Sequence, residues 1–306
     1  MANLTELKLE IQFNIRLGGL LEAIKAIAAQ QFQSLERTTQ QNPAFFSTIE
    51  SIAAVFPFES ISHPFTRPSG PRGVVAVTSD SGLLGGLNQQ VVLLAAQEFR
   101  QDPGEFIVVG ERGGSYAREF GLTYKSFPGV QDTNRHALAG QVREYLLNRV
   151  RAGHLAAVTI VYPRALSFSV QRIEIARALP CMEWFRDRAG ERLSMGEHVV
   201  LESSVNQLLE YLVWVWMGHK LNEVFSMSRL AEMAARAVHL EGSSQELQRR
   251  RRALWLKYFR QRHEVIDRNL RELFGARVPS VEEVVPEDEE LLALMEPPAG
   301  GKGLDG

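Results

Sequence analysis

The stretch VVAVTSDSGLLGGLNQQVVLLAAQEFR, residues 74–100, places a β-branched run, a glycine-rich turn and a helical segment in direct succession. Val74–Thr78 has the composition of a buried strand, and Gln89–Arg100 has that of a helix. The same alternation continues downstream, which predicts βαβ units, a mostly parallel sheet and an α/β fold with both sheet faces covered. We expect further strands at Phe106–Val109 and Ala157–Tyr162, an edge strand at Phe168–Leu179, and helices at Ser115–Phe120 and Asp132–Arg151.

Long helical patterns flank this region on both sides. In residues 3–55 the apolar side chains recur at steps of three and four, with a shift near Asn14. The pair Gly18-Gly19 inside this pattern costs about 1 kcal/mol per glycine relative to alanine. No proline interrupts residues 199–278, where a second helical pattern runs from about 201 to 274. A core-facing helix of an ordinary globule explains the first pattern equally well, but two such ends around one α/β insert suggest an antiparallel coiled coil.

The predicted chain has four parts, with a loop rich in proline, serine and glycine between Pro57 and Pro71. The last part is rich in proline and acidic residues, which is typical of a disordered tail. Shortly before it, Arg249–Arg252 form an uninterrupted basic run. The four parts are an N-terminal coiled-coil helix (1–56), an α/β domain (71–185), a C-terminal coiled-coil helix (200–276) and an acidic tail (277–306).

The composition excludes several classes of protein. With 45% hydrophobic and 23% charged residues the chain is not disordered as a whole, and its net charge of −2 favours neither nucleic acid nor a membrane surface as a partner. The single cysteine, Cys181, excludes an internal disulfide, and the seven histidines form no close pair at metal-ligand spacing. The start has no secretory pattern, and the most apolar run, Leu208–Met217, is too short to span a bilayer. We therefore expect a soluble intracellular protein.

The glycine-rich segment Ser79–Asn88 lies between a strand and a helix, where a phosphate-binding loop would lie. It lacks the Lys-Ser/Thr pair of a P-loop and the G-x-G-x-x-G spacing, and Gly110–Gly114 also departs from the dinucleotide pattern. We interpret both segments as tight strand-to-helix turns. No Ser-His-Asp or paired-carboxylate constellation is recognisable, so we expect no catalytic, cofactor-binding or metal-binding residues. The Arg249–Arg252 run suits an acidic partner protein as well as nucleic acid.

Several segments match the motifs of one family. The decisive one is Ser79–Asn88, SDSGLLGGLN, which is similar to the S-D-R-G-L-C-G-G-F-N motif of the γ subunit of F-type ATP synthases. Ala231–Ala237 is similar to that family's S-E-x-x-A-R-M motif. Over about residues 4–276 the chain resembles this family. Further similar segments are Leu7–Ile11 and Glu22–Ala29 near the N-terminus, Phe106–Gly113 and Val158–Tyr162 in the α/β region, and Arg262–Leu270 near the C-terminus.

The resemblance implies a central rotor shaft that couples ion flow through a membrane ring to ATP synthesis or hydrolysis. It implies a coiled-coil rod inside a hexamer of α and β subunits, and a Rossmann-like α/β domain at the foot with the ε subunit and the c ring. The complex would lie peripherally on the cytoplasmic side of the plasma membrane, with membrane contact only through the complex, no nucleic-acid partner and no cofactor. In such a complex the asymmetric rod would contact each β subunit differently and so favour conformations of different nucleotide affinity, which is a form of allosteric coupling.

The chain also departs from the family pattern. Gln12, Gly19 and Gln31 stand where the family has lysines, and Ser81 and Leu84 replace the arginine and cysteine of the central motif. With these departures, the chain resembles a divergent γ subunit from an alternate F-type complex. A sodium-translocating ATP synthase is an example of such a complex. The coupled ion, H⁺ or Na⁺, is not encoded here because ion ligands belong to the membrane ring.

Two hypotheses of different classes therefore compete. One is a non-catalytic rotor subunit. The other is a nucleotide- or cofactor-binding α/β enzyme whose helical arms serve oligomerisation. The lack of a recognisable catalytic constellation and the motif matches at both ends and the centre favour the rotor subunit.

Overall fold

A computed structural model of the chain describes residues 4–38, 43–55, 62–67, 69–181 and 204–275. It divides into two compact units, of which the first comprises Met1–Glu10 with Ala253–Gly306 and the second Ile11–Arg252. The second unit holds the α/β elements together with most of two long helices.

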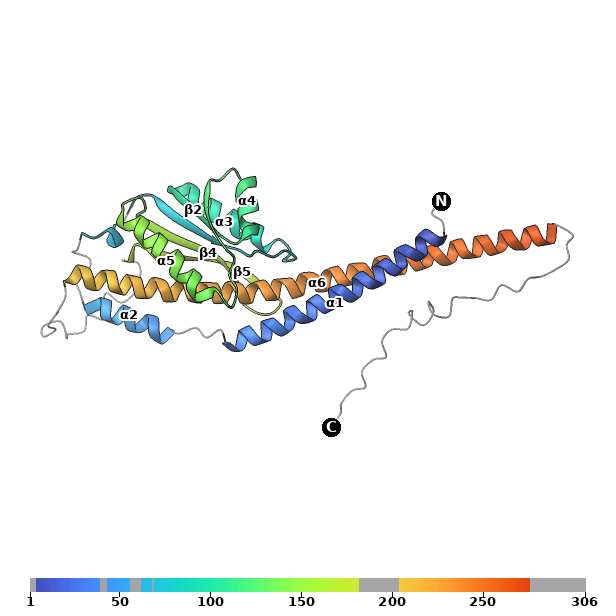
Figure 1. Ribbon diagram of the computed structural model, residues 1–306, viewed down its shortest axis with the longest axis horizontal. Helices are drawn as coiled ribbons and strands as arrows, with labels where there is room; N and C mark the ends of the chain where they lie inside the picture. The colour runs from blue at the N-terminus through green and yellow to red at the C-terminus, as the bar shows by residue number, and fades with distance from the viewer. Residues whose placement is uncertain (1–3, 39–42, 56–61, 68, 182–203, 276–306) are drawn as a thin grey trace, which may run out of the picture. The chain divides into compact units, whose positions relative to one another are not determined.

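A five-stranded sheet forms the centre of the Ile11–Arg252 unit (Figure 1). Its strand order is β3-β2-β1-β4-β5; β1 pairs in parallel with β2 and β4, β2 pairs in parallel with β3, and β5 runs antiparallel to β4 at one edge. After Arg72, the residues Gly73–Val77 of β1 are all buried, and Val74–Val77 form an uninterrupted apolar run, as expected of a central parallel strand. The strands are β1 (Arg72–Val77), β2 (Pro103–Val109), β3 (Tyr124–Phe127), β4 (Ala157–Ala165) and β5 (Gln171–Leu179).

Helices cover both faces of this sheet. Val74 and Ala76 of β1 face one core, which α3 (Leu87–Gln101) and α4 (Glu111–Glu119) complete. Val75 and Val77 face the opposite core, which α5 (Arg135–Arg151) and the first part of α6 (Val205–Gly275) complete. The side-chain alternation of one strand thus serves two helical layers. The predicted α/β fold with a covered, mostly parallel sheet is confirmed.

The long helices α1 (Leu4–Thr38) and α6 pair antiparallel within the Ile11–Arg252 unit (Figure 1). Phe32 of α1 packs with Met233 and Ala234 of α6, and Lys25 Nζ donates to Glu241 Oε2 at 2.8 Å further along. The seam residues of α1 recur at alternating steps of four and three, which is the heptad spacing of a coiled coil. These seam positions are 11, 14, 18, 21, 25, 28, 32 and 35, and each is buried or half-buried.

The seam explains the shift that the sequence shows near Asn14. Asn14, Gly18 and Lys25 occupy seam positions although they are not apolar, and Asn14 is 4% exposed. In contrast, Phe13, Leu20 and Ile27 lie on the outer side of α1 and are more than half exposed. The apolar residues that form the pattern in the sequence therefore lie on two different faces of α1.

Three sequence predictions require correction. The helix expected over 3–55 is two helices, α1 and α2 (Pro43–Val55), because a proline lacks the backbone N–H of a helix interior and disfavours helical geometry in the residue before it. Strand β3 was not predicted, since its YKSF sequence lacks an apolar run. Gly113 and Gly114 lie inside α4, which begins at Glu111 rather than at Ser115. The acidic tail 277–306 lies outside the described residues.

Candidate functional site

The glycine-rich segment Ser79–Asn88 forms a closed loop between β1 and α3. Asn88 holds its two ends together, because the Ser79 backbone N–H donates to Asn88 Oδ1 at 3.2 Å and Asn88 Nδ2 donates to Ser79 Oγ at 3.0 Å. Leu83 (φ 65°), Gly85 (φ 59°) and Gly86 (φ 90°) adopt left-handed backbone conformations in the turn between them. Only glycine adopts this region without strain, so the interpretation of these glycines as turn residues is confirmed.

Asp80 and Thr78 fasten the loop to neighbouring parts of the α/β fold. The Asp80 carboxylate accepts hydrogen bonds from the backbone N–H of Glu111, at the start of α4, and of Gly129, at 2.9 and 3.0 Å. A carboxylate at a helix N-terminus is favoured by the helix dipole. Thr78 Oγ1 donates to the Val109 carbonyl at 2.7 Å and accepts from the Gly113 N–H at 3.1 Å. The side chain of Asp80 thus occupies the place at α4 where an external anion would bind.

The loop packs directly against α6. Leu84 and Leu87 form a buried apolar cluster with Ala235 of α6. A Cβ atom on Gly85 would lie 3.4 Å from His239 Nδ1, so the backbone of the loop approaches α6 closely at this point. The glycine-rich motif therefore connects the α/β fold to the long helix.

A buried ion cluster completes the connection on the α6 side. Glu232 is 5% exposed, and its carboxylate accepts from Arg229 Nη1 at 2.8 Å and from Arg236 Nη2 at 2.6 Å. Arg229 Nε lies 3.8 Å from Asp132 Oδ1, which precedes α5. A cavity of about 270 Å³ lies between the two sides. Its lining residues are Asp80, Ser81, Val130, Gln131, Asp132, Thr133, Arg229 and Glu232.

We call this region, the loop 79–88 with residues 229–239 of α6, the motif joint. Its residues include the segment with the most specific family resemblance, Ser79–Asn88, and a second similar segment, Ala231–Ala237. They are more than 140 positions apart in the chain, and the fold brings them together. In the structure these motifs attach the α/β fold to α6.

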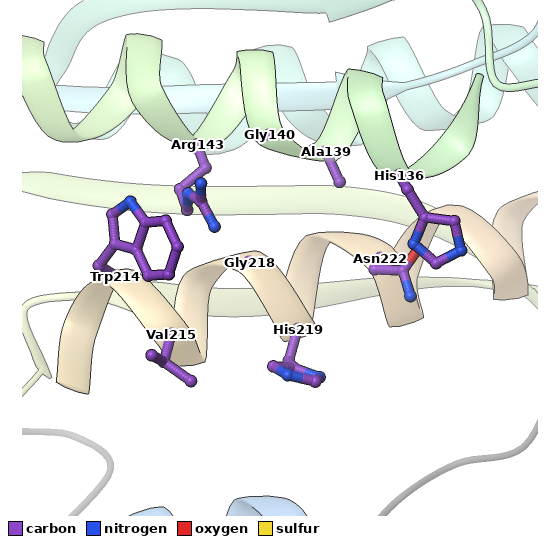
Figure 2. A pocket seen from close by; sticks show the side chains of 9 residues that line it. All are labelled: His136, Ala139, Gly140, Arg143, Trp214, Val215, Gly218, His219 and Asn222. Carbon is purple, nitrogen blue, oxygen red and sulfur yellow. The ribbon is translucent and has the colours of Figure 1, made fainter. Parts of the chain in front are cut away.

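Two further contacts attach the α/β fold to the helices. The hairpin between β4 and β5 reaches α1, where Phe168 meets Phe32 edge-to-face with ring centroids 5.1 Å apart. On α5, the Arg143 guanidinium lies 3.7 Å from the centroid of the Trp214 ring of α6, and Trp214 Nε1 donates to Glu144 Oε1 at 2.8 Å. Figure 2 shows Arg143 and Trp214 side by side between the two helices. The groove around them, of about 390 Å³, also has His136 and Asn222 in its lining.

Among the described residues, no group of three or more histidine, cysteine or acidic side chains is placed to hold a metal ion. Burial raises the pKa of the Cys181 thiol to about 12, and its Sγ lies 3.2 Å from the Phe65 carbonyl, so this thiol is a poor nucleophile. Burial, and then the neighbouring Glu174 carboxylate, raise the pKa of the Tyr162 hydroxyl. Within the described residues, no helix is both long and apolar enough to cross a membrane.

The Arg249–Arg252 run lies on α6 beyond the motif joint. Arg249 is exposed and pairs with the exposed Glu246 at 3.5 Å. Arg251 is half-buried and faces α1 across a small cavity. The run is therefore partly a packing element and partly a solvated surface.

An α/β fold bound through buried ion pairs and hydrophobic contacts to a pair of long antiparallel helices defines a structural class, that of helical stalk subunits. The family model described as ATP synthase matches residues 3–277. The chain belongs to the γ-chain family of F-type ATP synthases.

Curated relatives align with most of this chain. The ATP synthase gamma chain of Clostridium pasteurianum is 23% identical over 278 residues, covering 89% of this chain and 96% of the relative. That of Clostridium acetobutylicum is 25% identical over 264 residues, covering 84% and 90%. The identification made from the sequence motifs is confirmed.

Solved structures share the fold. A chain in the mitochondrial ATP synthase of Euglena gracilis, in a structure of OSCP, F1 and the c ring, superposes with a TM-score of 0.66 at 17% identity, over 92% of this chain and 98% of that one. A chain of the central stalk and c ring of the Tetrahymena thermophila mitochondrial enzyme gives a TM-score of 0.55 at 21% identity, over 74% and 99%.

Proposed function

We propose that this γ chain is the non-catalytic rotor shaft of an F-type ATP synthase, and that it couples rotation of a membrane ring to the catalytic hexamer. The observation that carries the proposal is the motif joint. A shaft must transmit torque between its foot and its rod, and the joint fixes the α/β fold to α6 through a buried ion cluster and an apolar cluster.

The partners follow from the same role. We place the rod inside the hexamer of α and β subunits, and the α/β fold at the foot with the ε subunit and the c ring. The Euglena gracilis structure comprises OSCP, F1 and the c ring, and the Tetrahymena thermophila structure comprises the central stalk and the c ring. At the far end of α6, Leu270, Leu273 and Phe274 are exposed by 46%, 60% and 87%. Exposed apolar side chains of this kind suit a contact surface for surrounding subunits.

We retain the four-part division at 1–56, 71–185, 200–276 and 277–306, in which the first part contains two helices, α1 and α2. We place the complex peripherally on the cytoplasmic side of the plasma membrane. Affinity purification from the native cell tests the assignment. The expected result is co-purification of α and β ATPase subunits with this chain, and purification of the chain without them would contradict it.

The isolated chain should neither hydrolyse ATP nor bind it at micromolar concentration. Its glycine-rich loop has no P-loop lysine, and the Asp80 carboxylate occupies the start of α4. Isothermal calorimetry with Mg²⁺-ATP measures this directly, with the variant Gly85→Val as a control on the loop. Micromolar binding that the variant abolishes would instead support the alternative of a nucleotide-binding enzyme.

A further inference from the structure

In one stretch of the helix pair α1–α6, the seam between the helices is less apolar than it is on either side of that stretch. We call this stretch, around residues 14–25 of α1, a level of the pair. Toward the motif joint the seam is apolar, with Ala28 and Phe32 of α1 buried and Met233 and Leu240 of α6 fully buried. Ile11, on the other side, is also buried. Between them the seam positions 14, 18 and 25 hold asparagine, glycine and lysine, whereas position 21 holds the half-buried Leu21. Ser244 of α6 takes a seam position at 4% exposure.

Residues of weak helix propensity occur in both helices within this stretch. Glu22 of α1 lies opposite Ser244 of α6 and accepts from its Oγ at 2.6 Å, whereas Gly18 lies opposite Leu247. The Gly18-Gly19 pair and the Gly242-Ser243-Ser244 segment are therefore displaced from each other along the helix pair. Glycine in a helix interior is unfavourable because its backbone loses the most conformational freedom. Each helix alone would be weakened within this stretch, at points that are offset along the pair.

Packing does not require these glycines. A Cβ atom on Gly19 or on Gly242 would meet no atom within 4 Å, and one on Gly18 would make an ordinary contact of 3.6 Å with Leu247. Gly113 in α4 differs from them, because a Cβ atom there would overlap Thr78 Oγ1, at a distance of 2.2 Å. Gly19 and Gly242 therefore increase the conformational freedom of the helix backbone, and they are not needed to let the two helices approach each other closely.

Polar contacts cross this level beside the apolar side chains of Leu21 and Leu247. Lys25 Nζ bridges Glu22 and Glu241, at 2.5 and 2.8 Å, and these side chains are partly exposed. A cavity of about 190 Å³ adjoins them, and its lining is mixed, with polar Asn14, Glu22, Ser244, Gln248 and Arg251 beside apolar Ile15 and Leu247. A cavity of this size and polarity admits water. Ion pairs and water-filled contacts re-form at small cost when helices shift, whereas a close-packed apolar seam does not.

We propose that residues 14–25 of α1 and 241–251 of α6 form a hinge in the helix pair, at which both helices bend and slide relative to each other. The apolar seam from Ala28 to Leu35 stays rigid. The hinge is a property of the chain itself and does not depend on the proposed rotor function.

Spin-label distance measurements on the full-length chain test the hinge. Labels at the exposed positions Phe13 and Ser34 of α1 span it, and labels at Tyr211 and Val238 of α6 form a control pair that does not. We expect a broader distance distribution for the pair that spans the hinge. We also expect the double variant Gly19→Ala/Gly242→Ala to narrow that distribution and to leave the control pair unchanged.

Amide hydrogen exchange gives a second readout on the same variants. Each alanine should slow exchange in its own hinge segment about fivefold, and Gly140→Ala, an equally open glycine in α5, should slow exchange in α5 only. Equal widths for the two label pairs in the unmodified chain would overturn the proposal. A double variant that slows exchange without narrowing the spanning distribution would overturn it as well, because the glycines would then affect helix propensity alone.

Discussion

Replacing Glu232 by alanine should lower the free energy of unfolding of the chain by about 3 kcal/mol, the cost of leaving buried charges without their partner. Glu232 is buried and holds Arg229 and Arg236, which are themselves mostly buried. Its loss leaves two guanidinium groups together at the motif joint, with the more distant Asp132 as the remaining acidic neighbour that the structure gives Arg229. Urea unfolding followed by circular dichroism measures the change.

The matched control lies on the same helix. Glu246 pairs with Arg249 at the surface, and both side chains are about three-quarters exposed. Such exposed pairs contribute at most about 1 kcal/mol, so Glu246→Ala should leave the unfolding midpoint almost unchanged. Equal effects of the two substitutions would show that the ion cluster at the joint is not what stabilises it.

Replacing Gly113 by alanine should destabilise the α/β fold by about 3 kcal/mol, at the upper end of the range for overpacking. The added methyl group would fall 2.2 Å from Thr78 Oγ1 and 2.8 Å from Val108 Cγ1, inside the packing of α4 on the sheet. It would also push apart the hydrogen bond by which Thr78 accepts from the Gly113 N–H. Thermal unfolding of the purified chain provides the measurement.

The same substitution at Gly140 serves as the control and should have the opposite sign. Gly140 lies inside α5, and a Cβ atom there would meet nothing within 4 Å. Alanine should therefore stabilise that helix by about 1 kcal/mol through propensity alone. A stabilising effect at Gly113 would mean that α4 does not pack against Thr78 as closely as described.

Local sequence patterns predicted the elements that local chemistry determines. The β-branched run at Val74–Thr78 and the proline-free interval 199–278 predicted β1 and α6. Strand β3 escaped prediction because an edge strand pairs through its backbone, and its side chains need not be apolar. The end of α1 was missed because apolar periodicity continues past Pro43, although the proline prevents the helix from doing so.

The motif joint could not be predicted from either motif alone. Asp132 and Glu232 are 100 positions apart in the sequence, and only the folded α5–α6 packing brings Arg229 between them. The resemblance marked both segments as family motifs, but it did not say that they touch. The hinge has a weak local signal, the Gly18-Gly19 pair. Its significance depends on the polar contacts with α6 that the fold places next to it, such as the one between Glu22 and Ser244.

The central claim is that this chain turns inside its hexamer, and single-molecule rotation tests it most directly. The complex of the chain with its α and β subunits would be immobilised through the hexamer, with a bead attached to a cysteine introduced at the exposed Glu119 of α4. The buried Cys181 should not compete for the label. The account predicts stepwise, unidirectional rotation of the bead when ATP is added. ATP hydrolysis by the assembled complex with a stationary bead would contradict it.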